Sequence, residues 1–240
     1  MIEPEKILIL LVQERNCFMH YTGTIWRPPY EAGSLLIEVT AGCTHHKCKF
    51  CTLYADLPFQ FCMSPLTDIE ADLQEAQYQL HERGSSRVKR VYLVGANPFV
   101  LQFKRLKEIS ELVHQYFMEC ETIGCFARVT DVALKTDEEL QELHGLGYDG
   151  ITIGAETGDE AALGAKIFNM TRPKIMGSSM LTIYPESELY GEIQKGRWQE
   201  ESELEKLEEV KALIEHLITP LSAIRIMSNL QEISVQREMK

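Results

Sequence analysis

Short apolar runs alternate with amphipathic stretches along most of this chain. Runs rich in apolar and β-branched residues are typical of buried strands, whereas apolar positions three and four residues apart are typical of helices that cover a sheet. The predicted strands are 35–39, 90–96, 121–129, 150–156 and 174–184, and the predicted helices are 67–83, 103–117, 136–145, 159–169 and 199–217. This alternation predicts an α/β fold with a mostly parallel sheet and outer helices.

Two of these helices are predicted to begin at a capping box. Thr67 is followed three residues later by Glu70, and Thr136 is followed in the same way by Glu139. In this arrangement each side chain bonds the backbone N–H of the other residue, which satisfies two donors at the helix start.

The two ends of the chain are less regular than its middle. We interpret 1–18 as an N-terminal appendage, 19–218 as one βα domain and 219–240 as a weakly structured tail that could form a loose helix. The apolar run at 7–12 is too short to span a bilayer, and neither a basic region nor a small-residue cleavage site flanks it. We therefore expect no membrane partner and a cytoplasmic protein.

Acidic residues outnumber basic residues by 36 to 24, which gives a formal net charge of −12. Sequence-independent binding of nucleic acid requires a basic surface that displaces counterions, so this charge disfavours a nucleic-acid partner. The odd number of cysteines, seven, fits a reducing compartment better than a disulfide framework. Four of them are interpreted as packed thiols without a special role: Cys17, Cys62, Cys120 and Cys125.

The strongest chemical signal is a loop with three cysteines directly after the first predicted strand. Cys43, Cys48 and Cys51 lie within the segment GCTHHKCKFC. Thiolates select zinc, copper(I) or iron–sulfur clusters, and three of them leave one position open. A zinc site would take His45 or His46 as its fourth ligand, and buried unligated thiols are a further alternative. The location after a strand favours an active site, because α/β folds place their active sites at the carboxyl ends of strands.

This loop resembles the cluster loop of the radical S-adenosylmethionine (SAM) superfamily. Four residues separate its first two cysteines instead of the general three, a spacing similar to that of a branch related to oxygen-independent coproporphyrinogen III oxidases. Three further segments resemble that branch in the same order: LVGANPFVL, CFARVTDVALKTDEELQELHGLGYDGITIGAETGD and IMGSSMLTIYPESELY. The resemblance covers about 19–218 and implies an incomplete (βα) barrel of the radical SAM type.

The resemblance also implies a set of cofactor roles. The three cysteines would hold three irons of a [4Fe–4S] cluster, and the fourth iron would chelate the amino and carboxylate groups of SAM. The implied SAM-binding residues are Phe50 near the adenine, Gly95, Ala96 and Asn97 at the amino group, Arg128 at the carboxylate and Glu156 at the ribose. A strand-ending turn, an ion-paired arginine and a helix-cap neighbour are the plain structural alternatives for these positions.

The chain departs from this family in one place. Only 17 residues separate Glu156 from Lys174, which leaves room for a single crossover helix. One to two βα elements are therefore expected to be missing near 163–165. The strand at 174–184 must then pair with the strand at 150–156 or leave an exposed edge.

The function implied by the resemblance is reductive cleavage of SAM followed by hydrogen abstraction from a small organic substrate. The reaction would need an electron donor such as flavodoxin or ferredoxin. A non-catalytic zinc-binding α/β protein and an inactive deletion variant remain as alternatives. No feature of the sequence selects a porphyrin as the substrate.

Overall fold

The computed structural model describes residues 19–85, 87–154, 175–179, 181–217, 223–227 and 232–235. The chain divides into two compact units. The first combines Met1–His46 with Leu53–Ala155, and the second combines Lys47–Thr52 with Glu156–Lys240. The predicted appendage, the helix predicted at 159–169 and the expected deletion near 163–165 lie outside the described residues.

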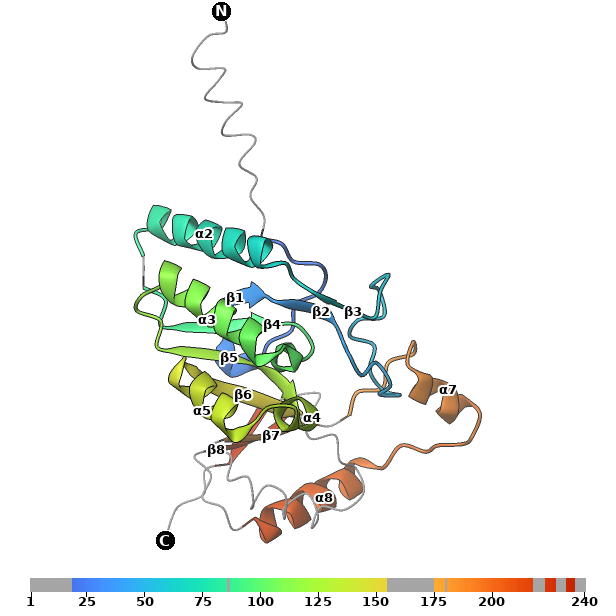
Figure 1. The fold of residues 1–240 in the computed structure, drawn as a ribbon. Helices are drawn as coiled ribbons and strands as arrows, with labels where there is room; N and C mark the ends of the chain where they lie inside the picture. The colour runs from blue at the N-terminus through green and yellow to red at the C-terminus, as the bar shows by residue number, and fades with distance from the viewer. Residues whose placement is uncertain are drawn as a thin grey trace, which may run out of the picture. The chain divides into compact units, whose positions relative to one another are not determined.

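A four-stranded parallel sheet forms the centre of the first unit (Figure 1). In spatial order its strands are β1 (Leu35–Glu38), β4 (Arg90–Val94), β5 (Thr122–Arg128) and β6 (Tyr148–Gly154). Every neighbouring pair is parallel, so the predicted α/β fold with a mostly parallel sheet is confirmed. Within the described residues the sheet is not closed, and β1 and β6 are its end strands.

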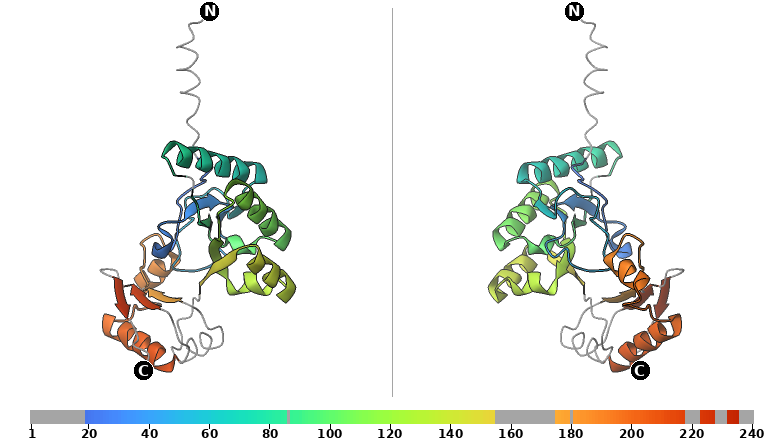
Figure 2. Two further views of the ribbon diagram at one scale, coloured as in Figure 1. Left: turned by 90° about the vertical axis from the view of Figure 1, so that its left-hand side faces the viewer. Right: turned by 90° about the vertical axis from the view of Figure 1, so that its right-hand side faces the viewer.

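Three helices cover one face of this sheet (Figure 1, Figure 2). They are α2 (Leu66–Glu82), α3 (Phe103–Tyr116) and α5 (Asp137–Gly145). Helix and sheet side chains form one core, whose most buried members include Ile37, Leu73, Leu93, Leu106, Ile109, Ile123 and Leu143. Each of these side chains contributes about 1.5–3 kcal/mol by leaving water. This packing fixes the strands whose carboxyl ends carry the candidate site.

Of the two predicted capping boxes, one is present in the structure and the other is not. At α5, Thr136 accepts a hydrogen bond from the Glu139 backbone N–H at 3.2 Å, and Glu139 accepts one from the Thr136 N–H at 3.0 Å. The capping box predicted at Thr67 is wrong, because α2 already begins at Leu66 with Pro65 as its N-cap. The extended backbone of Pro65 starts the helix without a side-chain cap, so Thr67 lies inside the first turn.

The irregular segment before β1 is fixed to the sheet by a buried ion pair. Glu31 is 1% exposed and accepts hydrogen bonds from Arg90 Nε at 2.7 Å and from Arg90 Nη2 at 2.5 Å. Gly124 and Gly150 leave the space that this guanidinium fills, since a Cβ atom would lie 2.6 Å and 2.1 Å from Nη2, respectively. The lead-in is therefore part of the folded unit.

The described residues of the second unit form a three-stranded sheet and two helices. β7 (Ile175–Ser179) pairs in parallel with β8 (Ala223–Met227), and β8 pairs antiparallel with β9 (Glu232–Val235). The helices are α7 (Glu188–Gln194), which the sequence did not predict, and α8 (Glu203–His216), which lies within the predicted range. No helix in the described ranges is both long enough and apolar enough to cross a membrane.

Two expectations about the C-terminal part differ from the structure. The strand at 174–184 is expected from the sequence either to pair with the strand at 150–156 or to leave an exposed edge. In the described sheets β7 pairs with β8 and not with β6, so the first of these two outcomes is wrong. The tail expected to be weakly structured or loosely helical contains β8 and β9. Strand formation there depends on pairing with the distant β7, which a local pattern does not reveal.

Candidate functional site

The carboxyl ends of the parallel strands lie along one edge of the first unit's sheet. β1 leads through β2 (Thr40–Gly42) toward the cysteine loop, β4 leads to Gly95, and β5 leads through Arg128 to α4 (Val129–Ala133). Parallel α/β sheets bind ligands at this edge. The predicted Glu156 follows β6 and lies outside the described residues.

The stem of the cysteine loop is held by a short antiparallel pair. β2 pairs with β3 (Phe61–Met63), and the Cys43 backbone N–H donates to the Gln60 carbonyl at 2.9 Å. Gly42 has a φ of +74°, and a Cβ atom there would lie 2.2 Å from the same carbonyl oxygen. Only glycine fits this approach, so Gly42 fixes where Cys43 leaves the sheet.

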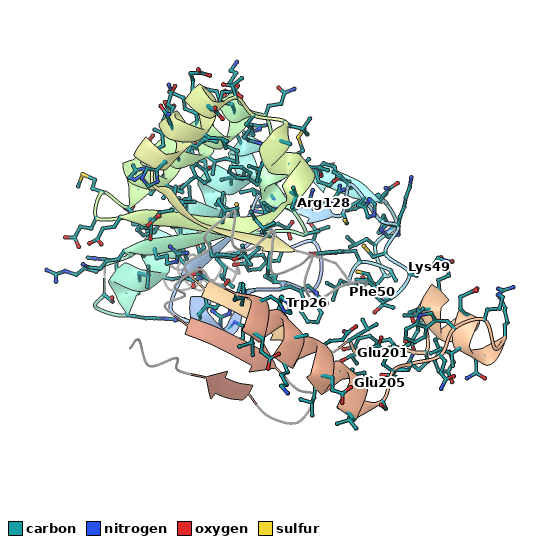
Figure 3. The ribbon with its side chains drawn as sticks, turned by 90° about the horizontal axis from the view of Figure 1, so that it is seen from below. Trp26, Lys49, Phe50, Arg128, Glu201 and Glu205 are labelled. Carbon is teal, nitrogen blue, oxygen red and sulfur yellow. The ribbon has the colours of Figure 1, made fainter. Side chains whose placement is uncertain are left out.

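The middle of the loop belongs to the second unit. The Cys51 backbone N–H donates to the Cys48 carbonyl at 3.0 Å, which closes a turn around Phe50. The Lys49 carbonyl accepts from the Leu189 N–H in α7 at 2.8 Å, and Lys49 Nζ lies 3.2 Å from Glu188 Oε1. Figure 3 labels Lys49 and Phe50 in this segment, and Phe50 is half-buried.

The loop offers thiols as metal ligands, but not in a preformed cage. Cys43 and Cys48 are half-buried, Cys51 is exposed, and none of the three forms a disulfide. Among the described residues, no three or more His, Cys, Asp or Glu side chains form a group that could hold a metal ion. By donor chemistry alone the three thiols fit an iron–sulfur cluster, because soft thiolates are its usual ligands.

The cysteines outside the loop lie in two different environments. Cys120 and Cys125 are buried as predicted, and burial raises the pKa of both thiols. The prediction that Cys62 is packed is wrong, because its side chain on β3 is exposed. The strand β3 pairs only with β2 in the described sheets and leaves this side chain uncovered. Cys17 lies outside the described residues.

Gly95 brings the end of β4 against the end of β1. It has a φ of +137°, and a Cβ atom would lie 2.0 Å from Thr40 Oγ1 and 2.6 Å from the Thr40 carbonyl oxygen. The close approach expected of this glycine is therefore made to the protein's own Thr40. Ala96 follows in a half-buried bend, and Asn97 after it is 1% exposed.

The Asn97 side chain, which follows β4, forms hydrogen bonds with residues that follow β2 and β5. Its Nδ2 group donates to Thr44 Oγ1 at 2.8 Å and to Asp131 Oδ2 at 3.0 Å. The same Asp131 oxygen accepts from the Arg128 backbone N–H at 2.8 Å, and Figure 3 labels Arg128. Sequence reasoning missed Thr44 and Asp131. The spacing of Asp131, three residues after the strand-ending Arg128, was the signal available for a helix-start acid.

Two buried polar atoms near these strand ends make no hydrogen bond within the described part of the chain, namely Thr40 Oγ1 and Asn97 Oδ1. An unsatisfied buried acceptor costs about 1–3 kcal/mol, so such atoms are usually bonded by a ligand or water. Thr40 also lines a small pocket with Glu38 and Gly95. Glu38 accepts from the Thr22 hydroxyl at 2.5 Å, and burial raises its pKa. These acceptors fit a ligand that brings N–H donors, as the SAM amino group does.

Comparison with known proteins gives one family match. A sequence model of the Radical SAM superfamily matches residues 37–177, which include the last two residues of β1, the cysteine loop and the whole of β4, β5 and β6. A comparison with curated proteins gives no significant match. A solved structure titled as an apo, cobalamin-dependent S-adenosylmethionine radical enzyme, OxsB, aligns with a TM-score of 0.42 and 13% identity. The alignment covers 91% of this chain and 40% of that chain, so this chain spans less than half of that protein.

Proposed function

The chain belongs to the radical SAM superfamily, and on that premise we propose that it binds a [4Fe–4S] cluster and SAM and abstracts a hydrogen atom from a small organic substrate. The observation that carries the proposal is the three-thiol loop that leaves the carboxyl end of β1 through Gly42. Three thiolates leave one iron of a four-iron cluster without a protein ligand.

When bound, the cluster and SAM supply one-electron cleavage of the S–C5′ bond of SAM, which gives methionine and a 5′-deoxyadenosyl radical that takes a hydrogen atom from the substrate. We assign Cys43, Cys48 and Cys51 to three irons of the cluster. The residues proposed to hold SAM are Phe50 at the adenine, Gly95, Ala96 and Asn97 at the amino group, Arg128 at the carboxylate and Glu156 at the ribose. Asn97 Oδ1 has no hydrogen-bond partner among the described residues, and this supports the amino-group assignment, because the N–H groups of the SAM amino group need acceptors.

The remaining parts of the proposal concern the reaction partners. A one-electron donor such as flavodoxin or ferredoxin must reduce the cluster, and the substrate is a small molecule whose identity the site does not specify. The coproporphyrinogen oxidase-like branch and the missing βα elements near 163–165 also belong to the proposal. If those elements are absent, the wall of the site after β6 is shortened.

Anaerobic reconstitution with iron and sulfide tests the proposal. We expect a brown protein with about four irons per chain, and 5′-deoxyadenosine after addition of a reductant and SAM. The variant Cys43→Ser is expected to lose the cluster and this product. Cys62→Ser is the matched control, because Cys62 is a further thiol near the loop in sequence but lies on β3. It should keep both.

Three outcomes would contradict parts of the proposal. A colourless protein with one tightly held zinc would favour a zinc site completed by His45 or His46. A full complement of iron without 5′-deoxyadenosine would favour an inactive deletion variant. Equal iron loss in Cys43→Ser and Cys62→Ser would contradict the assignment of the cluster ligands to the cysteine loop.

A further inference from the structure

Asp131 is a buried carboxylate to which the proposed function assigns no role. It is 1% exposed, and its Oδ2 atom accepts from the Arg128 backbone N–H and from Asn97 Nδ2. Lys135 Nζ lies nearby but bonds the Asp131 backbone carbonyl at 3.2 Å and the Phe99 carbonyl at 2.6 Å. Burial of an ionised carboxylate is costly unless hydrogen bonds compensate it. The Arg128 N–H and Asn97 Nδ2 therefore hold the Asp131 carboxylate in place.

The Asp131 carboxylate decides which way the Asn97 amide points. A carboxylate only accepts hydrogen bonds, so the Nδ2 end of the amide must face it. Thr44 Oγ1 accepts from the same nitrogen at 2.8 Å. The Oδ1 end is then the one left buried without a hydrogen-bond partner among the described residues. A free amide could rotate and present its donor end there instead.

We infer that Asp131 is a positioning residue for SAM. It holds the Asn97 amide so that Oδ1 accepts from an N–H of the SAM amino group, and it adds a negative charge one hydrogen bond behind that contact. Through Thr44, which follows Cys43 directly, the same amide is connected to the start of the cysteine loop. The identity of the ligand rests on the proposed function, whereas the locked amide rests on the contacts of Asp131.

Two variants of Asp131 separate the effect of its hydrogen bonds to Asn97 and Arg128 from the effect of its negative charge. In Asp131→Ala both hydrogen bonds are lost, so we expect SAM to bind about tenfold more weakly to the reconstituted protein with iron content unchanged. In Asp131→Asn the amide oxygen can replace Oδ2 and keep both bonds while the charge is lost. This variant should recover part of the affinity, to within about threefold of wild type. Equilibrium dialysis with labelled SAM and iron analysis measure both quantities.

Glu139→Ala is the matched control. Glu139 occupies the same position at the start of α5 that Asp131 occupies in α4, and it accepts from the Thr136 backbone N–H at 3.0 Å. The control therefore loses the same kind of helix cap without touching Asn97. If Glu139→Ala weakens SAM binding as much as Asp131→Ala does, the effect is one of general stability and the inference is wrong. Wild-type affinity in Asp131→Ala would also overturn it.

A second measurement needs neither cluster nor SAM. In the cofactor-free protein the Asn97 Nδ2 protons should exchange slowly with solvent, and Asp131→Ala should remove this protection, as followed by side-chain amide NMR signals. If the exchange rate is the same in Asp131→Ala as in wild type, Asp131 does not hold the Asn97 amide, whatever ligand the protein binds. If the wild-type protein fails to bind SAM, both the proposed function and the assignment of SAM as the ligand are wrong. The exchange measurement would then still show whether Asp131 holds the Asn97 amide.

Discussion

At the scale of single residues, two glycines decide how closely the strand ends approach each other. Gly42 and Gly95 both have positive φ angles, and a side chain at either position would collide with backbone atoms. A positive φ alone disfavours other residues, and the contact with Thr40 adds a steric barrier at Gly95. The geometry of the candidate site thus depends on the absence of two side chains.

Replacement of Gly95 by alanine should destabilise the protein by about 2–4 kcal/mol, because both backbone strain and overlap with Thr40 must be relieved. Urea denaturation measures the effect as a lower midpoint. Gly145→Ala is the control, since nothing lies within 4 Å of a Cβ atom at that helical position. The control should change stability by less than about 1 kcal/mol. Equal midpoints for Gly95→Ala and wild type would contradict the tight approach to Thr40.

At the scale of elements, helix starts depend on which backbone donors find a side-chain acceptor. The capping box at Thr136 and Glu139 is present, and a second box at Ser202 and Glu205 begins α8. The similar pattern at Thr67 makes no such box, since Pro65 begins the helix two residues earlier. A capping motif therefore locates the first residue of a helix only together with the residues that precede it.

This difference predicts opposite results for two similar substitutions. Thr136→Ala should cost about 1 kcal/mol, because the Glu139 N–H loses its acceptor. Thr67→Ala should be close to neutral, because Thr67 is exposed inside a helix and its hydroxyl donates to the neighbouring Asp68 side chain, at 3.2 Å. Thermal or urea unfolding of both variants checks the pair. A loss at Thr67 as large as that at Thr136 would mean that the sequence-predicted cap operates after all.

At the scale of the whole chain, contacts between distant segments hold the first unit together. Glu31 in the lead-in and Arg90 in β4 are 59 residues apart and form a buried pair, while Gly124 and Gly150 on the next two strands make room for it. Burial acts to raise the pKa of Glu31, but the hydrogen bonds from Arg90 and Ser34 hold it below its ordinary value of 4.5. The pair therefore links stability to pH.

Glu31→Gln should lower stability by about 2 kcal/mol at neutral pH, because the Arg90 charge loses its partner. The pKa of Glu31 is lowered by folding, so its contribution is present above pH 4.5 and disappears as the pH falls through the lowered value. The difference from wild type should therefore shrink as the pH falls from 4.5 through the lowered pKa of Glu31, as measured by urea unfolding across pH.

Glu121→Gln is the control for this prediction, because it breaks an ion pair with Lys89 whose two side chains are 64% and 67% exposed. Exposed pairs contribute less than about 1 kcal/mol. A Glu31→Gln effect that stays constant from pH 7 down to the lowest pH at which the wild-type protein is still folded would show that packing, and not the charge, is responsible.

Local patterns were sufficient to predict the alternation of strands and helices, the cap at Thr136 and the three-cysteine loop with its family resemblance. Periodicity, cap spacing and cysteine spacing depend on neighbours along the chain, so one sequence reveals them. The exposure of Cys62, the pairing of β7 with β8 and the fit of Arg90 against Gly124 and Gly150 were not predictable in this way. They depend on which segments meet after folding.

The same distinction applies within the candidate site. The family resemblance identified Asn97 as a candidate, but its contacts with Thr44 and Asp131 join residues 53 and 34 positions away. The direction of the amide follows from those two partners, and no local signal encodes it. Residue chemistry along the chain thus identified which groups are available, and the packing of distant strand ends decided which atom of Asn97 is left to accept a hydrogen bond.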